Sequence, residues 1–366
     1  MSRTRELKAE KLQAENKIEN YRQIERKSYS DLKLFAKDRK KYYKLKVLKD
    51  VEEIEKDQKS KEQNPSIRMG NLVDVRLTDN DNFDKYFVRT DAPVPTGQML
   101  ILANFLFDYT LRDTDDNGVV TSQFSDRFEE AYNSLKEQNG GKLQSGIEKF
   151  LQRFPLEAEG YYKDKLNAVG KTIISLEEEQ KSETIANDLM YSIGTKELVM
   201  WPHKVTKYPI LFEIFGELFK AEIDQIRFDH ENKKIYLDDY KCSSFVETFQ
   251  WEILDSMYYV QATVYYWGAT QWFADHKEYS EYEVVPEFTF IVADQNNATK
   301  PLIFVMDQNH LERAWYDFKV GSKRYKGLIT ILEELKFAET HNMWDMSVEN
   351  YKNKGRVLVP NFESYE

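Results

Sequence analysis

Sparse apolar residues at helical spacing mark the first part of the chain, which is otherwise strongly polar. Residues 4–27 are rich in Glu, Lys, Arg and Gln and are predicted to form one helix, although their apolar positions keep no heptad. Ser30 is the predicted N-cap of a second helix over 31–48. Residues 50–66 are charged and end in Asn-Pro, so we expect a linker or surface loop there, before a short helix that starts near Ile67.

The middle of the chain is predicted to be helical. Apolar residues at helical spacing follow Thr96, which can cap a helix over 97–112. Ser175 and Glu178 form a capping box that opens a helix running to about residue 193. Between these two helices the pattern predicts helices over 122–137, 145–153 and 156–168. We therefore expect residues 96–193 to be a helical insertion.

Strand-like alternation appears only in the last part of the chain. Strands are predicted over 209–215, 221–228, 234–241, 282–293 and 301–307, and helices over about 250–272 and 309–337. The tail, residues 338–366, is weakly patterned. The expected fold class is α/β, in the mixed α+β sense: a small mixed sheet at about 209–308 flanked by helices, with a large helical N-terminal half.

Composition excludes several classes of protein. Among the 366 residues, 41% are hydrophobic and 14% aromatic, which is typical of a globular chain with a large core. The single cysteine, Cys242, excludes a disulfide framework, a cysteine-rich zinc site and a cysteine-ligated iron–sulfur cluster. No apolar run reaches the length of a membrane span, and the charged first 27 residues do not resemble a signal peptide. A cytoplasmic protein without a membrane partner is expected.

Charge is unevenly distributed along the chain. The net charge is −11, yet residues 1–63 hold 19 Lys and Arg against 13 Asp and Glu. Residues 1–27 are therefore expected to form a basic helical arm on an acidic body. Such an arm can contact nucleic acid, and the alternative is a solvated helix with paired charges.

Two acidic residues lie on strand faces that otherwise require a core. Because side chains alternate along a strand, Asp239 and Lys241 share a face with Ile235 and Leu237. Asp224 repeats the anomaly on the preceding strand. Burying a charge is costly unless it is paired or coordinated. These residues are therefore candidates for a functional site.

The spacing of the two strands brings these carboxylates together. A turn near residues 229–233 would form an antiparallel hairpin and place Asp224 across from residue 238 or 239, where opposed Cβ atoms lie roughly 5 Å apart. Two carboxylates that close repel each other unless a cation lies between them, and oxygen ligands suit Mg²⁺ or Mn²⁺. The alternative is an exposed hairpin with a surface ion pair, because Asp-x-Lys is a common sequence.

The order of these motifs resembles the PD-(D/E)XK nuclease superfamily. Asp224, a hairpin, the run Asp239-Tyr240-Lys241 and a helix with Gln261 and Tyr265 follow one another as they do in that family, most closely in its RecB-like branch and its phage-encoded exonucleases. The resemblance implies a restriction-endonuclease-like core within a nuclease domain over 28–366.

Two N-terminal segments support the resemblance. The run Tyr29–Phe35 resembles the family's opening helix, which has a Ser near its start. The run Arg68–Asp74 resembles the helix that supplies an early acidic or His metal ligand, and Asp74 stands where many relatives have His. Glu213, on the strand before Asp224, matches an acidic position of relatives.

The resemblance also implies roles for the individual residues. The implied ligands of one or two Mg²⁺ or Mn²⁺ ions are Asp74, Asp224, Asp239, the backbone carbonyl of Tyr240 and, as a secondary candidate, Glu213. Lys241 would orient the attacking water or stabilise charge on the phosphate. Gln261 and Tyr265 would position the DNA backbone or the catalytic hairpin, or would simply pack the helix against the sheet.

These expectations lead to a metal-dependent DNA nuclease, an exonuclease of phage-type recombination or replication that acts in the host cytoplasm with a single-strand annealing or binding protein as partner. The first alternative is a non-catalytic nucleic-acid-binding or virion-associated protein on the same fold. The second is a homo-oligomeric scaffold built through helix 4–27. Phosphate contacts would come from the arm and from a basic rim, whose candidates are also consistent with plain surface: Lys204, Lys207, Lys323, Arg324 and Lys326.

Overall fold

Two compact units make up the chain. The computed structural model describes residues 21–62, 64–90, 92–143 and 145–356. Unit 1 comprises Met1–Asp74 with Thr184–Glu366, and unit 2 is Val75–Glu183. Unit 2 therefore starts earlier and ends earlier than the predicted insertion at 96–193. Residues 1–20, most of the predicted basic arm, lie outside the described residues.

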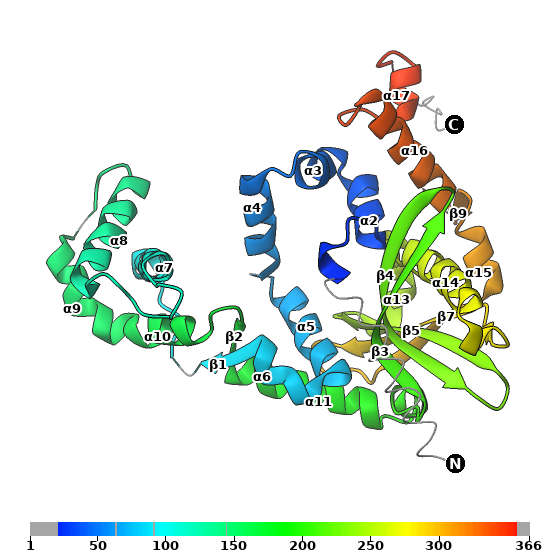
Figure 1. Ribbon diagram of the computed structural model, residues 1–366, viewed down its shortest axis with the longest axis horizontal. Helices are drawn as coiled ribbons and strands as arrows, with labels where there is room; N and C mark the ends of the chain where they lie inside the picture. Colours follow the sequence, from blue (N-terminus) through cyan, green and yellow to red (C-terminus); the bar gives the residue numbers. More distant parts are fainter. Residues whose placement is uncertain (1–20, 63, 91, 144, 357–366) are drawn as a thin grey trace, which may run out of the picture. The chain divides into compact units, whose positions relative to one another are not determined.

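A mixed sheet forms the centre of unit 1, as the sequence predicted (Figure 1). Its strands are β3 (Lys204–Ile214), β4 (Glu217–Asp229), β5 (Lys234–Ser243), β7 (Phe288–Asp294) and β8 (Leu302–Met306), in that spatial order. The pairings are antiparallel except that β5 runs parallel to β7 and to the short β6 (Glu283–Val284). The three predicted strands at 209–241 are thus present and longer than expected.

Two turns set the register of the strands that matter most. Phe215 and Gly216 both have positive φ, 50° and 81°, which is the signature of a two-residue hairpin turn whose twist matches the strands. They join β3 to β4 with Ile214 opposite Glu217. At the next turn the Asp229 carboxylate accepts the backbone amides of Glu231 and Asn232, each at 3.0 Å. Local turn chemistry therefore fixes which residues face each other across β3, β4 and β5.

Helices cover the sheet of unit 1. They include α2 (Tyr29–Lys37), α13 (Phe249–Asp255), α14 (Tyr258–Asp275), α15 (Gln308–Arg313) and α16 (Leu328–His341), and the short α17 (Val348–Lys352) follows α16. Gly268 lets α14 approach β3, because a Cβ there would lie 2.6 Å from the Phe212 ring. Phe273 stacks on Tyr208 of β3 and meets Phe228 of β4 edge-on. None of the described helices combines the length and apolarity that crossing a membrane requires.

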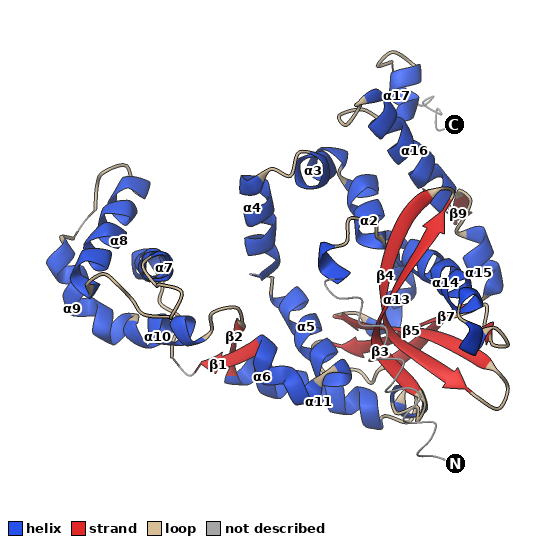
Figure 2. Cartoon of the chain, in the orientation of Figure 1, coloured by secondary structure: helices blue, strands red, loops and turns tan. Residues whose placement is uncertain are grey.

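Unit 2 is mainly helical (Figure 2). Its helices α7 (Gly97–Arg112), α8 (Phe124–Gln138), α9 (Ile147–Glu157) and α10 (Glu159–Asn167) match the predicted ones to within a few residues, and they enclose a core of their own. The unit also contains α6 (Phe83–Tyr86) and two parallel strands that the sequence analysis did not predict, β1 (Phe87–Thr90) and β2 (Thr172–Ser175). Helices α5 (Pro65–Thr78) and α11 (Leu176–Tyr191) run from one unit into the other.

The helix predicted over 31–48 starts earlier and is interrupted. Ser28, rather than Ser30, is the N-cap of α2, and it forms a reciprocal capping box with Asp31. Asp38 then leaves the helical conformation at φ −149° and caps α3 (Arg39–Tyr42), which continues into a π-helical turn, Tyr43–Val47. The polar Asp side chain competes for backbone amides and divides the helix.

Residues 50–66 were predicted to be a loop or linker, and that prediction was wrong for most of the segment. They contain α4 (Val51–Glu62), because Glu, Lys and Gln are good helix formers even without an apolar face. The Asp50 side chain accepts the amide of Glu53 and so caps the first turn. The Asn-Pro pair that ends the segment marks the start of α5, where the Asn64 side chain accepts the Ser66 amide.

The long helix predicted over 309–337 is divided as well. A small hairpin, β9 (Phe318–Val320) and β10 (Lys323–Tyr325), separates α15 from α16. Gly321 turns the hairpin with a positive φ of 59°. Gly327 then lies so close to the Tyr316 backbone that a Cβ would clash at 2.2 Å. The predicted helix at 250–272 also breaks, at Met257, whose φ is 60°.

Candidate active site

Asp224 and Asp239 meet where the β4–β5 ladder ends. The register pairs Gln225 with Asp238, so Asp224 and Asp239 are the next opposed positions. The Asp224 carboxylate accepts the backbone amide of Tyr240 at 3.1 Å. The predicted approach of these two carboxylates across the hairpin is thus present in the structure.

Asp239 is held by side chains from two elements. It is 2% exposed, and Lys241 of the same strand pairs with its Oδ2. Gln261 of α14 donates from Nε2 to Asp239 Oδ1 at 2.6 Å. Both carboxylate oxygens therefore have donors, and Gln261 acts on the hairpin rather than lying free for a ligand.

A third carboxylate and a second lysine complete the cluster. Asp74 comes from α5, and the ammonium of Lys207 on β3 lies 2.6 Å from Asp74 Oδ2 and 2.7 Å from Asp224 Oδ1. One cationic group therefore bridges two carboxylates. Lys207 was predicted as a basic-rim residue, but it is only partly exposed and belongs to the carboxylate cluster.

The β3–β4 ladder is disturbed at this bridge. Lys207 lies in register with Asp224, yet the ladder pairs on either side omit these two residues. Lys207 has a φ of 50°, which is strained for a residue with a side chain. The buried positions of β3 also change phase here, from Val205 to Tyr208. The carboxylate cluster thus lies at a local defect of the β3–β4 ladder. A strictly alternating strand pattern did not predict this defect.

Burial and neighbouring charges move the pKa values of the three carboxyl groups apart. Burial raises the pKa of Asp239 to about 7, against the opposing effect of Lys241 and with the help of Asp224. Burial and repulsion from Asp224 raise the pKa of Asp74 to about 6, against the pull of Lys207. Burial would also raise the pKa of Asp224, but Lys207 and Lys241 hold it below its usual value. Asp224 is thus the carboxylate that stays ionised.

The two lysines stay protonated. Burial opposes their charge, but the carboxylates outweigh it and raise the pKa of Lys207 and of Lys241 above the usual value. A protonated Lys241 can donate a hydrogen bond to a phosphate but cannot serve as a general base at neutral pH.

A cavity of about 420 Å³ opens onto this cluster. Asp74, Lys207, Asp224 and Lys241 line it, and α5 supplies part of its wall. Cys242 also lines it, but burial raises the pKa of this thiol to about 12, which excludes a thiolate nucleophile. The cavity therefore offers carboxylates and ammonium groups to a ligand.

The other predicted site residues lie in different surroundings. Tyr265, one turn after Gln261, is partly buried, and its ring meets Phe288 edge-on. The Tyr240 hydroxyl donates to Gln225 on the opposite face of the sheet. Glu213 is exposed and opposes Leu218 near the far end of β3, six residues along β4 from Asp224, which corresponds to roughly 20 Å. The structure does not bring Glu213 to the cluster.

The predicted basic rim is largely paired with protein groups. Lys323 forms an ion pair with Asp255 at 2.5 Å, and Lys326 pairs with Glu334 at 2.7 Å. Lys204 donates to the carbonyl of Val199. These lysines have partners of their own and do not line the cavity at the carboxylates.

A buried ion pair lies behind the site, on the opposite face of the hairpin. Arg227 donates from Nε and Nη2 to the two oxygens of Asp238, at 2.6 and 2.9 Å. Gln225 donates to the same carboxylate at 2.8 Å. The network braces the strands that carry Asp224 and Asp239, and nothing in the sequence analysis predicted it.

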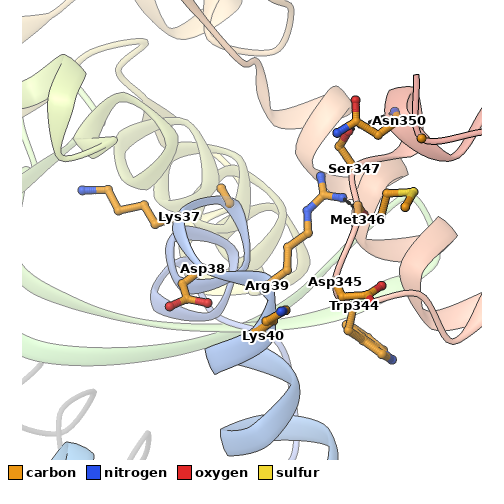
Figure 3. A pocket seen from close by; sticks show the side chains of 11 residues that line it. Lys37, Asp38, Arg39, Lys40, Trp344, Asp345, Met346, Ser347 and Asn350 are labelled. Carbon is orange, nitrogen blue, oxygen red and sulfur yellow. Dashed lines mark hydrogen bonds between the residues drawn. The ribbon is translucent and has the colours of Figure 1, made fainter. Parts of the chain in front are cut away.

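A second cavity, of about 450 Å³, lies between the α2–α3 junction and residues 344–355 (Figure 3). Arg39 points into this region, but its guanidinium already donates to the Met346 carbonyl at 2.8 Å and pairs with Glu334 at 2.5 Å. Lys37 points away from this group in the figure. Arg39 therefore joins α3 to α16 and to the segment before α17, and its guanidinium is already engaged by protein groups.

Oxygen donors of the carboxylate cluster suit a divalent cation. In the described ranges, no three His, Cys, Asp or Glu side chains gather into a metal-ligand group. Asp74 and Asp224 do converge on one cation, the Lys207 ammonium, and Asp239 is the next carboxylate across the ladder. Carboxylate oxygens are the ligands that Mg²⁺ and Mn²⁺ prefer. Asp74 and Asp224 would share such an ion only with the Lys207 side chain displaced, and Asp239 would join them only by giving up the donors Lys241 or Gln261.

Comparison with known proteins adds little to this geometry. No protein-family model and no curated protein matches the chain. Among solved structures, the crystal structure of a "Putative exonuclease" from Eubacterium rectale is similar at a TM-score of 0.31 and 12% identity, over 63% of this chain and 83% of that one. A likeness of this size establishes neither the fold nor the activity of the chain.

Proposed function

We propose that the protein is a metal-dependent DNA nuclease of the PD-(D/E)XK type, an exonuclease that hydrolyses phosphodiester bonds. The observation that carries the proposal is the meeting of Asp224, Asp239 and Lys241 at one end of the β4–β5 hairpin, where Asp224 and Lys241 line a cavity. Two carboxylates and an ammonium at that spacing combine cation binding with phosphate binding. A structural ion pair alone does not need the third carboxylate, that of Asp74.

Divalent metal would supply the Lewis acid of the reaction. Asp74, Asp224 and Asp239, with the carbonyl of Tyr240, would hold Mg²⁺ or Mn²⁺, which would polarise the scissile phosphate and lower the pKa of a bound water. In hydrolysis the water oxygen forms a bond to phosphorus, one ester P–O bond breaks, and the departing oxygen takes a proton.

Lys241 and Gln261 have separate tasks in this proposal. Lys241 remains an ammonium, so it donates to a phosphoryl oxygen and stabilises the charge that develops there. Gln261 holds Oδ1 of Asp239 at 2.6 Å and so orients that carboxylate. Gln261 is thus a positioning residue. Tyr265, one turn further along α14, packs against Phe288 and would hold that helix against the sheet.

The position of Lys207 favours a second candidate, a non-catalytic nucleic-acid-binding protein on the same fold. In this alternative the Lys207 ammonium permanently takes the place of a metal ion between Asp74 and Asp224. The cluster is then electrically balanced without metal. Cation binding decides between the two candidates.

Digestion of DNA tests the nuclease proposal. Linear duplex, circular duplex and single-stranded DNA are incubated with the full chain in Mg²⁺, Mn²⁺ or EDTA. We expect linear DNA to be lost only with metal, and circles to survive. Lys241→Ala is expected to lose activity by a factor of at least about 100, which corresponds to one charge-stabilising donor.

Lys323→Ala serves as the matched control, because Lys323 is an exposed lysine in a surface ion pair. It should cleave like the wild type. Folded protein that leaves every DNA intact under all conditions would overturn the nuclease and favour the non-catalytic role.

A further inference from the structure

Helix α2 is fixed beside the carboxylate cluster. The Tyr29 hydroxyl donates to the backbone carbonyl of Ser256 at 2.9 Å, just before α14 begins. Leu32 and Phe35 are fully buried in the core of unit 1. The helix therefore holds Lys33, one turn after Tyr29, in a fixed place next to the start of α14.

Lys33 and Lys241, the lysine proposed to act in catalysis, contact the same aromatic ring. Its ammonium lies 4.9 Å from the ring centroid of Tyr258, and the Lys241 ammonium lies at the same distance from that centroid. The two ammonium groups are thus separated by no more than twice this distance. Lys33 comes from α2 and Lys241 from β5, so distant parts of the sequence place two cations around one ring.

Unlike the other lysines of this region, Lys33 has no carboxylate partner among the residues that the structure describes. Lys207 and Lys241 each pair with Asp residues, whereas the contacts of Lys33 are with the faces of Tyr29 and Tyr258. A half-buried ammonium without an ion-pair partner is stabilised by an anion supplied from outside. Burial, together with Lys37 and Lys241, lowers the pKa of Lys33 to about 8, against the opposing charge of Glu252.

We propose that Lys33 binds the DNA phosphate next to the scissile one, while Lys241 binds the scissile phosphate. This inference rests on the proposed nuclease function. Both ammonium groups contact the ring of Tyr258, which would keep them at a fixed spacing along the strand. Helix α2 then forms one wall of the substrate path, and Lys33 is a substrate-binding residue outside the carboxylate motif.

Single-turnover cleavage of a linear duplex, with enzyme in excess and at several salt concentrations, tests the assignment. The Lys33→Met variant keeps the length of the side chain and removes its charge. We expect the enzyme concentration for half-maximal rate to rise about tenfold, as for the loss of one charge-assisted contact, with the maximal rate changed less than about twofold. The logarithm of that concentration rises with the logarithm of the salt concentration, and the slope of this line should fall by about 0.9, the value for one phosphate contact on duplex DNA.

Two further variants sharpen the test. Lys33→Arg should recover most of the binding and of the salt slope, because it restores the charge. Lys37→Met, one turn along the same helix and exposed, should behave as the wild type. Circular dichroism checks that each variant is folded.

The outcomes separate this inference from the function on which it rests. If the wild type cleaves DNA with metal, and folded Lys33→Met keeps both the half-maximal concentration and the salt slope, the assignment of Lys33 is overturned and the nuclease stands. If the folded wild type neither binds nor cleaves DNA, the proposed function and the assignment of Lys33 are both overturned.

Discussion

The three carboxyl groups of the site differ in how readily they ionise, and that difference has a consequence for activity. Asp224 is ionised well below neutrality, whereas the pKa of Asp239 is raised to about 7 by burial and by the charge of Asp224. A metal ligand must be deprotonated, so protons and metal compete for Asp239. The site is therefore expected to be complete only near and above neutral pH.

This competition predicts a pH profile. At limiting Mg²⁺, the cleavage rate should rise about tenfold between pH 6 and pH 8, as for one group that titrates near 7. Raising the Mg²⁺ concentration should move the midpoint to lower pH, because metal displaces the proton. Initial cleavage rates across this pH range give the midpoint. A midpoint that does not change with the Mg²⁺ concentration would contradict the role of Asp239.

At the residue scale, the sequence predicted the carboxylates and Lys241, but not that Lys207 joins them. Asp224 and Asp239 were found because charged residues on a core face are anomalous. Lys207 was placed on the surface because the turn at Phe215–Gly216 was not used to set a register, although that turn puts Lys207 opposite Asp224. No sequence pattern indicated that Lys33 lies near the site, because its neighbours there are distant in sequence and depend on how α2 packs.

At the scale of elements, a buried ion pair braces the β4–β5 hairpin on the face opposite the site. Arg227 and Asp238 form a two-point ion pair with side chains 7% and 0% exposed. Such a pair contributes little net energy as a whole, but removing one partner leaves the other buried without compensation. The hairpin therefore depends on both partners.

Substitution of one partner should be severe. Asp238→Asn is expected to lower the free energy of unfolding by about 3–5 kcal/mol, measured by urea denaturation. The control is Asp255→Asn, which breaks the exposed pair with Lys323 and should cost less than about 1 kcal/mol. The double variant Arg227→Met with Asp238→Leu should recover most of the loss. Equal effects of Asp238→Asn and Asp255→Asn would show that the buried pair does not brace the hairpin.

Elements with strong periodicity were predictable, and interrupted ones were not. The sheet strands β3, β4 and β5 were found by alternation, and α7 by its apolar stripe after Thr96. The division of 309–337 was missed because the turn at Gly321 and the close packing of Gly327 on Tyr316 were not read from the helical spacing. Helix α4 was missed because it lacks an apolar face, and charged helix formers resemble a linker.

At the scale of the whole molecule, the carboxylate cluster and its two lysines belong entirely to unit 1. Asp74 is the last residue of unit 1 before the chain enters unit 2, and α5 carries both. The overall charge of −11 gives no general attraction for DNA. Under the proposed function, binding would come from local cations, such as those of Lys33, Lys241 and the metal. We expect it to weaken steeply with salt.

Titration of the full chain with Mn²⁺ by calorimetry tests the central claim, that Asp74, Asp224 and Asp239 hold a divalent cation in place of the Lys207 ammonium. The wild type should bind at least one Mn²⁺. Asp224→Asn should weaken that binding at least about tenfold, because one ionised ligand is lost. Lys207→Met should bind more tightly than the wild type, since no ammonium competes for the carboxylates. Absence of Mn²⁺ binding in the folded wild type, or equal binding in Asp224→Asn, would contradict the claim.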